Sequence, residues 1–125
     1  MSLLGWCALL VSLVVQAYGL YAPQMPGPDG VPGLDKVGHL VAFAVPAALA
    51  WWLRARWLLP VLVLHALVSE PLQAALAPGR QPDLLDAVAD LTGIALGVWV
   101  AATTSRRWGH DGDMGETSAP VRGES

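Results

Sequence analysis

Residues 69–97 read SEPLQAALAPGRQPDLLDAVADLTGIALG, and this stretch decides how the chain is organised. Within it, Glu70 and Asp90 lie in sequence that is apolar enough to cross a lipid bilayer. A carboxylate inside a membrane-spanning segment is costly, and it usually faces other polar groups or marks a functional site. We therefore expect the rest of the chain to supply the helices and polar groups that surround these acids.

The composition of the chain indicates a membrane protein. Its 125 residues are enough for one domain, 54% of them are hydrophobic, and the mean hydropathy is +0.50. Only 14% are charged, whereas an ordinary soluble domain carries about 25%. The net charge of -3 argues against nucleic acid as a partner, and a single cysteine, Cys7, excludes an internal disulfide framework.

Four apolar segments predict an all-α, four-helix transmembrane bundle. The expected spans cover residues 3–21, 36–53, 57–77 and 84–104. Residues 105–125 are polar and predict a disordered cytoplasmic tail. The first span resembles a signal peptide in length, but no basic side chain precedes it, which favours a retained helix.

The second span carries a lysine and a histidine on one side. Asp35 precedes it, and its carboxylate is expected to accept hydrogen bonds from the free N–H groups of the first turn. Lys36 and His39 are three residues apart and therefore share a face of the helix. This face presents polar groups near the beginning of the span.

The third span contains an acid beside a proline. Glu70 and Gln73 share a face, and Pro71 is expected to open the helix within one turn of Glu70 because proline lacks a backbone N–H. His65 lies about 140° around the helix from Glu70. We expect it to be a packed, neutral histidine without a functional role.

The fourth span places two acids and two glycines on one stripe. Asp83 is expected to cap this helix. Asp86, Asp90, Gly93 and Gly97 then follow at positions i, i+4, i+7 and i+11. The two glycines form a GxxxG motif, which allows another helix backbone to approach closely. The stripe is therefore expected to face the polar sides of other helices.

The distribution of basic residues predicts the orientation of the bundle. Arg54 and Arg56 lie in the connection between the second and third spans, and Arg106 and Arg107 follow the fourth. Four crossings place both pairs on the same side as the two termini. The positive-inside rule makes that side cytoplasmic, so the topology is N-in and C-in.

In this topology, polar residues of three spans meet in the extracytoplasmic half of the membrane. A buried carboxylate without a partner is strongly unfavourable, so we expect the acids and bases to form one compact cluster. The predicted cluster comprises Asp35, Lys36, His39, Glu70, Gln73, Arg80, Asp86 and Asp90.

The chain resembles the VanZ-like family of small bacterial integral membrane proteins over roughly residues 34–104. The resemblance is carried by Asp35-Lys36-x-x-His39-x-x-x-Phe43, by Glu70-x-x-Gln73 followed by Pro78-Gly79-Arg80, and by Asp86-x-x-x-Asp90-x-x-Gly93-x-x-x-Gly97. Two positions depart from the family pattern. The family usually has asparagine where this chain has Asp90, and Pro71 within the Glu-Gln motif is unusual.

The resemblance implies a VanZ-like transmembrane domain at residues 1–104, located in the bacterial plasma membrane. The family is similar to a protein associated with resistance to the lipoglycopeptide-type antibiotic teicoplanin. The resemblance implies a family and a location more firmly than an activity. Our first functional hypothesis is a non-enzymatic envelope protein whose polar pocket binds a lipid head group, a cell-wall precursor or an amphiphile such as a glycopeptide. Membrane lipids are expected partners, and a homo-oligomer is an option.

Three other functions remain open at the level of the sequence. An intramembrane enzyme acting on a lipid-linked substrate would use Glu70 or an aspartate as general base, with His39 as its partner. A small proton-coupled carrier would use Glu70 and Asp90. A purely structural network would use Lys36 and Arg80 to neutralise the acids.

No nucleophile motif or complete metal-ligand spacing supports the enzyme. We therefore assign neither a metal site nor a cofactor from the sequence. A set of four residues is able to hold a divalent cation only if the fold brings them together: His39, Glu70, Asp86 and Asp90.

Overall fold

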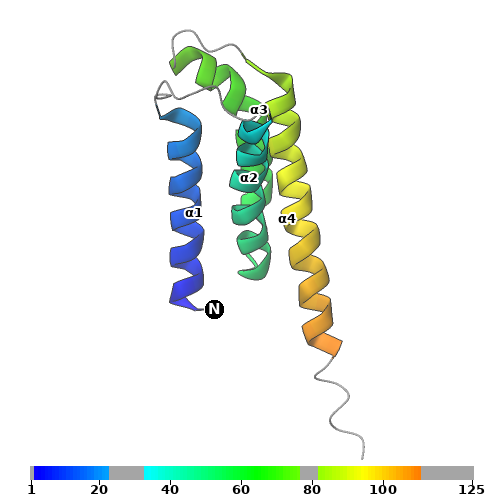
Figure 1. The fold of residues 1–125 in the computed structure, drawn as a ribbon. Helices are drawn as coiled ribbons and strands as arrows, with labels where there is room; N and C mark the ends of the chain where they lie inside the picture. The colour runs from blue at the N-terminus through cyan, green and yellow to red at the C-terminus, as the bar shows by residue number, and fades with distance from the viewer. Residues whose placement is uncertain (1, 23–32, 77–81, 111–125) are drawn as a thin grey trace, which may run out of the picture.

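The computed structural model describes residues 2–22, 33–76 and 82–110. Its helices are α1 (Leu3–Tyr21), α2 (Leu34–Trp52), α3 (Leu58–Leu76) and α4 (Leu84–His110). They alternate in direction, so the start of α1 and the end of α4 lie at the same end of the bundle (Figure 1). The prediction of an all-α, four-helix fold is confirmed.

All four helices are long and apolar enough to cross a membrane. The bundle also exposes large apolar side chains on its outside, among them Val14, Leu64, Leu67 and Trp99. Such a surface is unfavourable in water, but it matches the hydrocarbon interior of a bilayer. The fold is that of a multi-pass membrane protein.

Two helix boundaries differ from those predicted by two residues or more. α4 continues beyond Thr104 to His110, so residues 105–110, which we expected in the tail, are helical; residues 111–125 lie outside the described part of the chain. α2 begins at Leu34, and its N-cap is Gly33 in the left-handed conformation with φ of 83°. Asp35 therefore lies in the first turn and does not cap the helix.

The predicted cap of α4 is present. The backbone N–H of Leu85 donates to Oδ1 of Asp83 at 2.9 Å. This bond satisfies one of the four N–H groups that a helix leaves free at its N-terminus. It fixes the start of α4 and the position of Asp83 beside it.

The closest helix pair is α2 and α4, which are not neighbours in the sequence. A Cβ atom added to Gly93 would collide with the backbone carbonyl of Leu40, and one added to Gly97 would collide with that of Ala44. The GxxxG motif thus brings the two backbones into direct contact. Because Asp86 and Asp90 share the stripe of these glycines, the same packing directs both acids toward α2.

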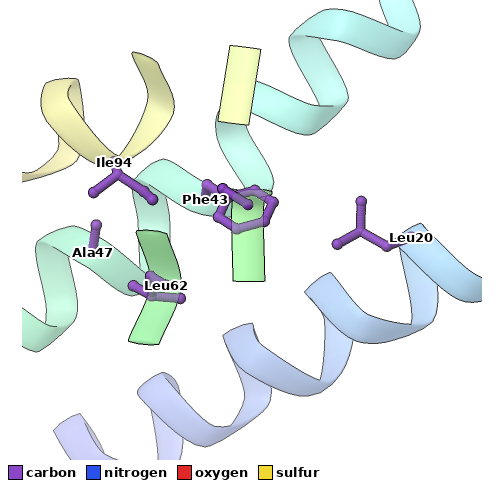
Figure 2. Packing of buried hydrophobic residues seen from close by; sticks show 6 residues of the cluster. Leu20, Phe43, Ala47, Leu62 and Ile94 are labelled. Carbon is purple, nitrogen blue, oxygen red and sulfur yellow. The ribbon is translucent and has the colours of Figure 1, made fainter. Parts of the chain in front are cut away.

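The apolar core lies between the four helices. Phe43 is fully buried, with Leu20 on one side and with Leu62 and Ile94 in the same cluster (Figure 2). The end of the bundle that holds the N-terminus has a second, smaller cluster around Leu9. The polar residues occupy the remaining interior, toward the end of the bundle where α1 and α3 end and α2 and α4 begin.

α3 is bent. In Figure 1 its C-terminal part turns away from the line of its first part and crosses toward the end of α1. Pro71 lies inside this helix and provides a physical cause, because it removes one backbone hydrogen bond and its ring clashes with the preceding turn. The helix nevertheless continues to Leu76, so the local opening expected beside Glu70 takes the form of a bend.

Candidate functional site

The interior of the bundle contains a group of buried polar side chains contributed by α2, α3 and α4. Those no more than 7% exposed are His39, Ser69, Glu70, Gln73, Asp86 and Asp90. Together with Lys36 and Asp83 at the rim, these eight residues are called the polar cluster below. Because α2 packs closely on α4, the basic residues of α2 lie opposite the acids of α4.

Lys36 links α2 to the beginning of α4. Its Nζ donates to Oδ2 of Asp83 at 2.7 Å and to Oδ1 of Asp86 at 2.8 Å. The Lys36 ammonium, helped by the N–H of Leu85, lowers the pKa of the Asp83 carboxyl below its usual value. Asp35 lies at the surface of this end, and its Oδ2 is 3.7 Å from the same ammonium.

Asp90 joins three helices from a fully buried position. Its Oδ1 is 2.9 Å from Nδ1 of His39, and its Oδ2 accepts a hydrogen bond from the Ser69 hydroxyl at 3.2 Å. Whenever the Asp90 carboxylate only accepts in this contact, Nδ1 of His39 carries the proton. The lone pair of a neutral His39 is then on Nε2, which lies 3.7 Å from Oδ2 of Asp86.

The contacts of Ser69, Asp90 and His39 differ from those of a catalytic triad. In a triad the histidine stands between the serine and the acid and takes the proton of the serine. Here Ser69 and His39 bind different oxygens of the Asp90 carboxylate. The hydroxyl of Ser69 also lies 2.9 Å from the carbonyl oxygen of Ala66. The arrangement therefore links the three side chains through Asp90 and lacks the serine–histidine contact of a triad.

Among the described residues, Glu70 is bonded to a backbone N–H and to no basic side chain. Its Oε2 accepts from the N–H of Asp83 at 2.8 Å. Among the described residues, its buried Oε1 has no hydrogen-bond partner, and neither amide atom of Gln73 has one. We expected a basic partner for Glu70, but Lys36 binds Asp83 and Asp86 instead. Arg80, the other expected partner, lies outside the described residues.

The structure brings six of the predicted site residues into the cluster interior or its rim. These are Lys36, His39, Glu70, Gln73, Asp86 and Asp90. One ligand atom each from His39, Glu70 and Asp86 lies within 4.8 Å of the others. The sequence analysis allowed a divalent-cation site only if four side chains meet in space, and three of the four do: His39, Glu70 and Asp86.

Three polar residues that take part in the interior or the rim of the bundle were not predicted as site residues from the sequence. Ser69 has a signal that was available, since it lies four residues before Gln73 and therefore on the same face of α3. Gln16 also has one, because it is the only carboxamide in the apolar sequence of α1. Asp83 was interpreted only as a cap, and its pairing with Lys36 depends on how α2 and α4 pack.

A pocket of about 370 Å³ lies between α1 and α2. Most of its wall is apolar, including Val15, Leu20 and Val41, whereas Gln16, Asp35 and His39 supply polar groups. Gln16 is only 2% exposed, and its Nε2 has no hydrogen-bond partner among the described residues. The pocket thus combines an apolar wall with an unused donor, and it reaches the polar cluster through His39.

His65 is packed, as expected from its position. The Tyr21 hydroxyl lies 2.8 Å from its Nε2, and the ring of Phe43 lies 5.5 Å from its ring, measured between centroids. These neighbours satisfy and enclose the imidazole on a side of α3 that is separate from Glu70. His65 therefore joins α1 to α3 and is not a member of the polar cluster.

The chain matches no protein-family model, no curated protein and no solved structure. The resemblance to the VanZ-like family stays a prediction that rests on the motifs quoted above.

Proposed function

We propose that this chain is a VanZ-like protein of the bacterial plasma membrane that binds an amphiphile without transforming it chemically. The observation that carries this proposal is the pocket between α1 and α2, which has apolar walls and polar groups in one small volume. Binding sites for small molecules commonly combine a mostly apolar lining with a few placed polar groups. An acyl chain would lie along Val15 and Val41, and its head group would contact Gln16 and Asp35.

The charge of this end of the bundle selects the head group. Five acids lie there: Asp35, Glu70, Asp83, Asp86 and Asp90. Among the described residues, the basic side chains paired with members of this group are Lys36 and His39. Excess negative charge favours a cationic ligand and disfavours an anionic one. We therefore infer an amphiphile with an amine-bearing or hydroxyl-rich head group, of the kind carried by lipoglycopeptides, rather than a lipid phosphate.

A binding role also agrees with the chemistry of the cluster. Ser69 is bonded to an acid and a carbonyl, and the imidazole of His39 is committed to Asp90 through Nδ1. In a catalytic triad the imidazole takes the proton of the serine, and among the described residues no hydrogen bond joins Ser69 to His39. These groups hold a fixed shape beside the pocket, which suits recognition.

The proposal predicts that the protein prefers an alkylamine to an alkyl phosphate of the same chain length. The protein would be purified in nanodiscs, and bound amphiphile would be counted by native mass spectrometry. We expect the alkylamine to bind at least about tenfold more tightly, because the acids attract its head group. Gln16→Leu should weaken binding, because it removes the unused donor from the pocket wall.

Ser12→Ala is the matched control, since Ser12 is a polar residue of α1 whose hydroxyl bonds to the Leu9 carbonyl and which does not line the pocket. It should bind as the wild type does. Equal binding of the amine and the phosphate, or equal binding by the wild type and Gln16→Leu, would contradict the proposed pocket.

The proposal places the polar cluster on the extracytoplasmic side. Arg56 lies at the opposite end, where its guanidinium stacks on Trp51 at 4.2 Å from the ring centroid. Basic and aromatic residues of this kind are typical of the cytoplasmic interface. We therefore expect Asp29 and Arg80 to be extracytoplasmic, and Arg56 and the tail to be cytoplasmic.

Single-cysteine variants in a background that lacks Cys7 test this orientation in intact cells with an impermeant thiol reagent. A cysteine at position 29 should be labelled, and a cysteine at position 118 should react only after the cells are permeabilised. The reverse pattern would place the polar cluster in the cytoplasmic half of the membrane.

A further inference from the structure

We propose that His39, Glu70 and Asp86 form a binding site for a divalent transition-metal ion. The three residues come from α2, α3 and α4, all are buried, and one ligand atom from each lies within 4.8 Å of the other two. This inference goes beyond the proposed amphiphile pocket, which lies between α1 and α2. The ion would bind on the side of His39 that faces α3 and α4.

The hydrogen bonds of the cluster leave one atom of each residue available. Asp86 uses Oδ1 to accept from Lys36, and Glu70 uses Oε2 to accept from the N–H of Asp83. His39 uses Nδ1 toward Asp90. The remaining atoms are Oδ2 of Asp86, Oε1 of Glu70 and Nε2 of His39, all of which are metal-ligating atoms.

The environment of His39 is the one usually found around a histidine that binds a metal. Such a histidine donates its other ring N–H to a carboxylate or carbonyl, which fixes the tautomer and makes the ligating nitrogen more basic. Asp90 takes this position, and Ser69 in turn fixes its second oxygen. Asp90 is thus a positioning residue that acts on the ion through His39.

A second, independent observation is the unsatisfied Oε1 of Glu70. Glu70 is 6% exposed, and a buried carboxylate oxygen without a partner is unfavourable. Gln73, 1% exposed and on the same face of α3, has neither amide atom bonded among the described residues. Unused polar groups on this face indicate that something polar belongs beside it, and an ion between Glu70, His39 and Asp86 would satisfy the carboxylate directly.

The donor set indicates the class of ion. One imidazole nitrogen with two carboxylate oxygens suits Zn²⁺, Mn²⁺, Fe²⁺ or Co²⁺, whereas Mg²⁺ and Ca²⁺ prefer oxygen ligands alone. Ligands about 2.1 Å from a tetrahedral ion lie about 3.4 Å from one another. The 3.7 Å separation of His39 Nε2 from Asp86 Oδ2 is close to this value. Two carboxylates also balance the charge of a divalent ion.

The test measures metal binding by the full-length protein in detergent. Equilibrium dialysis against Zn²⁺ followed by elemental analysis should give about one ion per chain for the wild type. Glu70→Gln and Asp86→Asn each remove one ligating oxygen while keeping the side-chain shape, and each should weaken binding by at least tenfold. Mg²⁺ at the same concentration should not displace the Zn²⁺.

Asp35→Asn is the matched control, because Asp35 is an exposed acid at the same end of the bundle that offers no ligand to the site. It should bind Zn²⁺ as the wild type does. Co²⁺ provides a second readout, since its visible absorption should change in Glu70→Gln and in Asp86→Asn but not in Asp35→Asn. Circular dichroism shows whether each variant is folded.

A wild-type protein that binds no Zn²⁺ or Co²⁺ would overturn the proposal, and this result does not depend on any variant. Binding that Glu70→Gln and Asp86→Asn leave unchanged would overturn it as well. Stoichiometric binding that both variants lose while helical, and that Asp35→Asn retains, would support the three ligands named here.

Discussion

Gly93→Val should destabilise the bundle by about 3 kcal/mol or more and sharply lower its abundance in the membrane. The added side chain would meet the backbone carbonyl of Leu40, which cannot rotate away as a flexible side chain would. α2 and α4 would have to separate, and the bonds of Lys36 and His39 to the acids of α4 would lengthen together. The measurement is the free energy of unfolding in mixed micelles.

Gly38→Ala is the matched control for this prediction, because a Cβ at Gly38 meets no atom within 4 Å. Alanine inside a helix is favoured over glycine by about 0.5–1 kcal/mol, so this variant should be slightly more stable than the wild type. If Gly93→Val were as stable as Gly38→Ala, the close contact of α2 with α4 would be wrong.

Glu70→Gln and Asp90→Asn should differ in their effect on function. Glu70 presents a buried, unpartnered oxygen beside the bend of α3, so its charge is available to a ligand or an ion. Its loss should abolish the envelope or glycopeptide-resistance phenotype that we propose, while the protein remains in the membrane. Both oxygens of Asp90 are engaged inside the bundle, and asparagine should be tolerated there.

The hydrogen bonds explain why asparagine fits at position 90. Its carbonyl oxygen accepts from Nδ1 of His39, and its amide donates to the Ser69 hydroxyl, which remains free to donate to the Ala66 carbonyl. A charge at the centre of a span costs about 3 kcal/mol, and its removal offsets the weaker hydrogen bonds that asparagine makes. Membrane abundance and glycopeptide susceptibility of the two variants, measured side by side, provide the test.

The opposite result would assign the central role to Asp90. A Glu70→Gln strain as resistant as the wild type, next to an Asp90→Asn strain that has lost resistance, would mean that the buried link between His39 and Ser69 carries the function. Equal abundance of the two proteins is the control that separates this outcome from a failure to fold.

The fold was predictable because each membrane span is visible in the sequence as a long apolar segment. Long apolar segments define the helices, and the stripe from Asp86 to Gly97 identifies the face of α4 that packs. Helix ends were harder to place. The polar sequence after Thr104 still forms helix as far as His110, because hydrophobicity predicts membrane depth and not where backbone hydrogen bonding stops.

The partners within the cluster were less predictable than its members. Lys36 was expected to share one cluster with Glu70, Asp86 and Asp90, without a specific partner. It binds Asp83 and Asp86, because the contact of Gly93 with Leu40 sets α2 against α4. Glu70 bonds to a backbone N–H, a kind of partner that side-chain patterns do not reveal. Sequence spacing shows which residues share a face of one helix, but the pairing of faces depends on three-dimensional packing.

The contact between α2 and α4 also has a consequence for biogenesis. α2 is synthesised first and enters the membrane before the acids that will face it exist. α4 arrives last and carries Asp86 and Asp90, whose insertion into lipid alone is costly. If α2 is already in the membrane, its Lys36 and His39 are available to pair with Asp86 and Asp90 when α4 inserts. Defects on this face of α2 should therefore first appear as degraded nascent chains, before any mature protein is available to show a loss of activity.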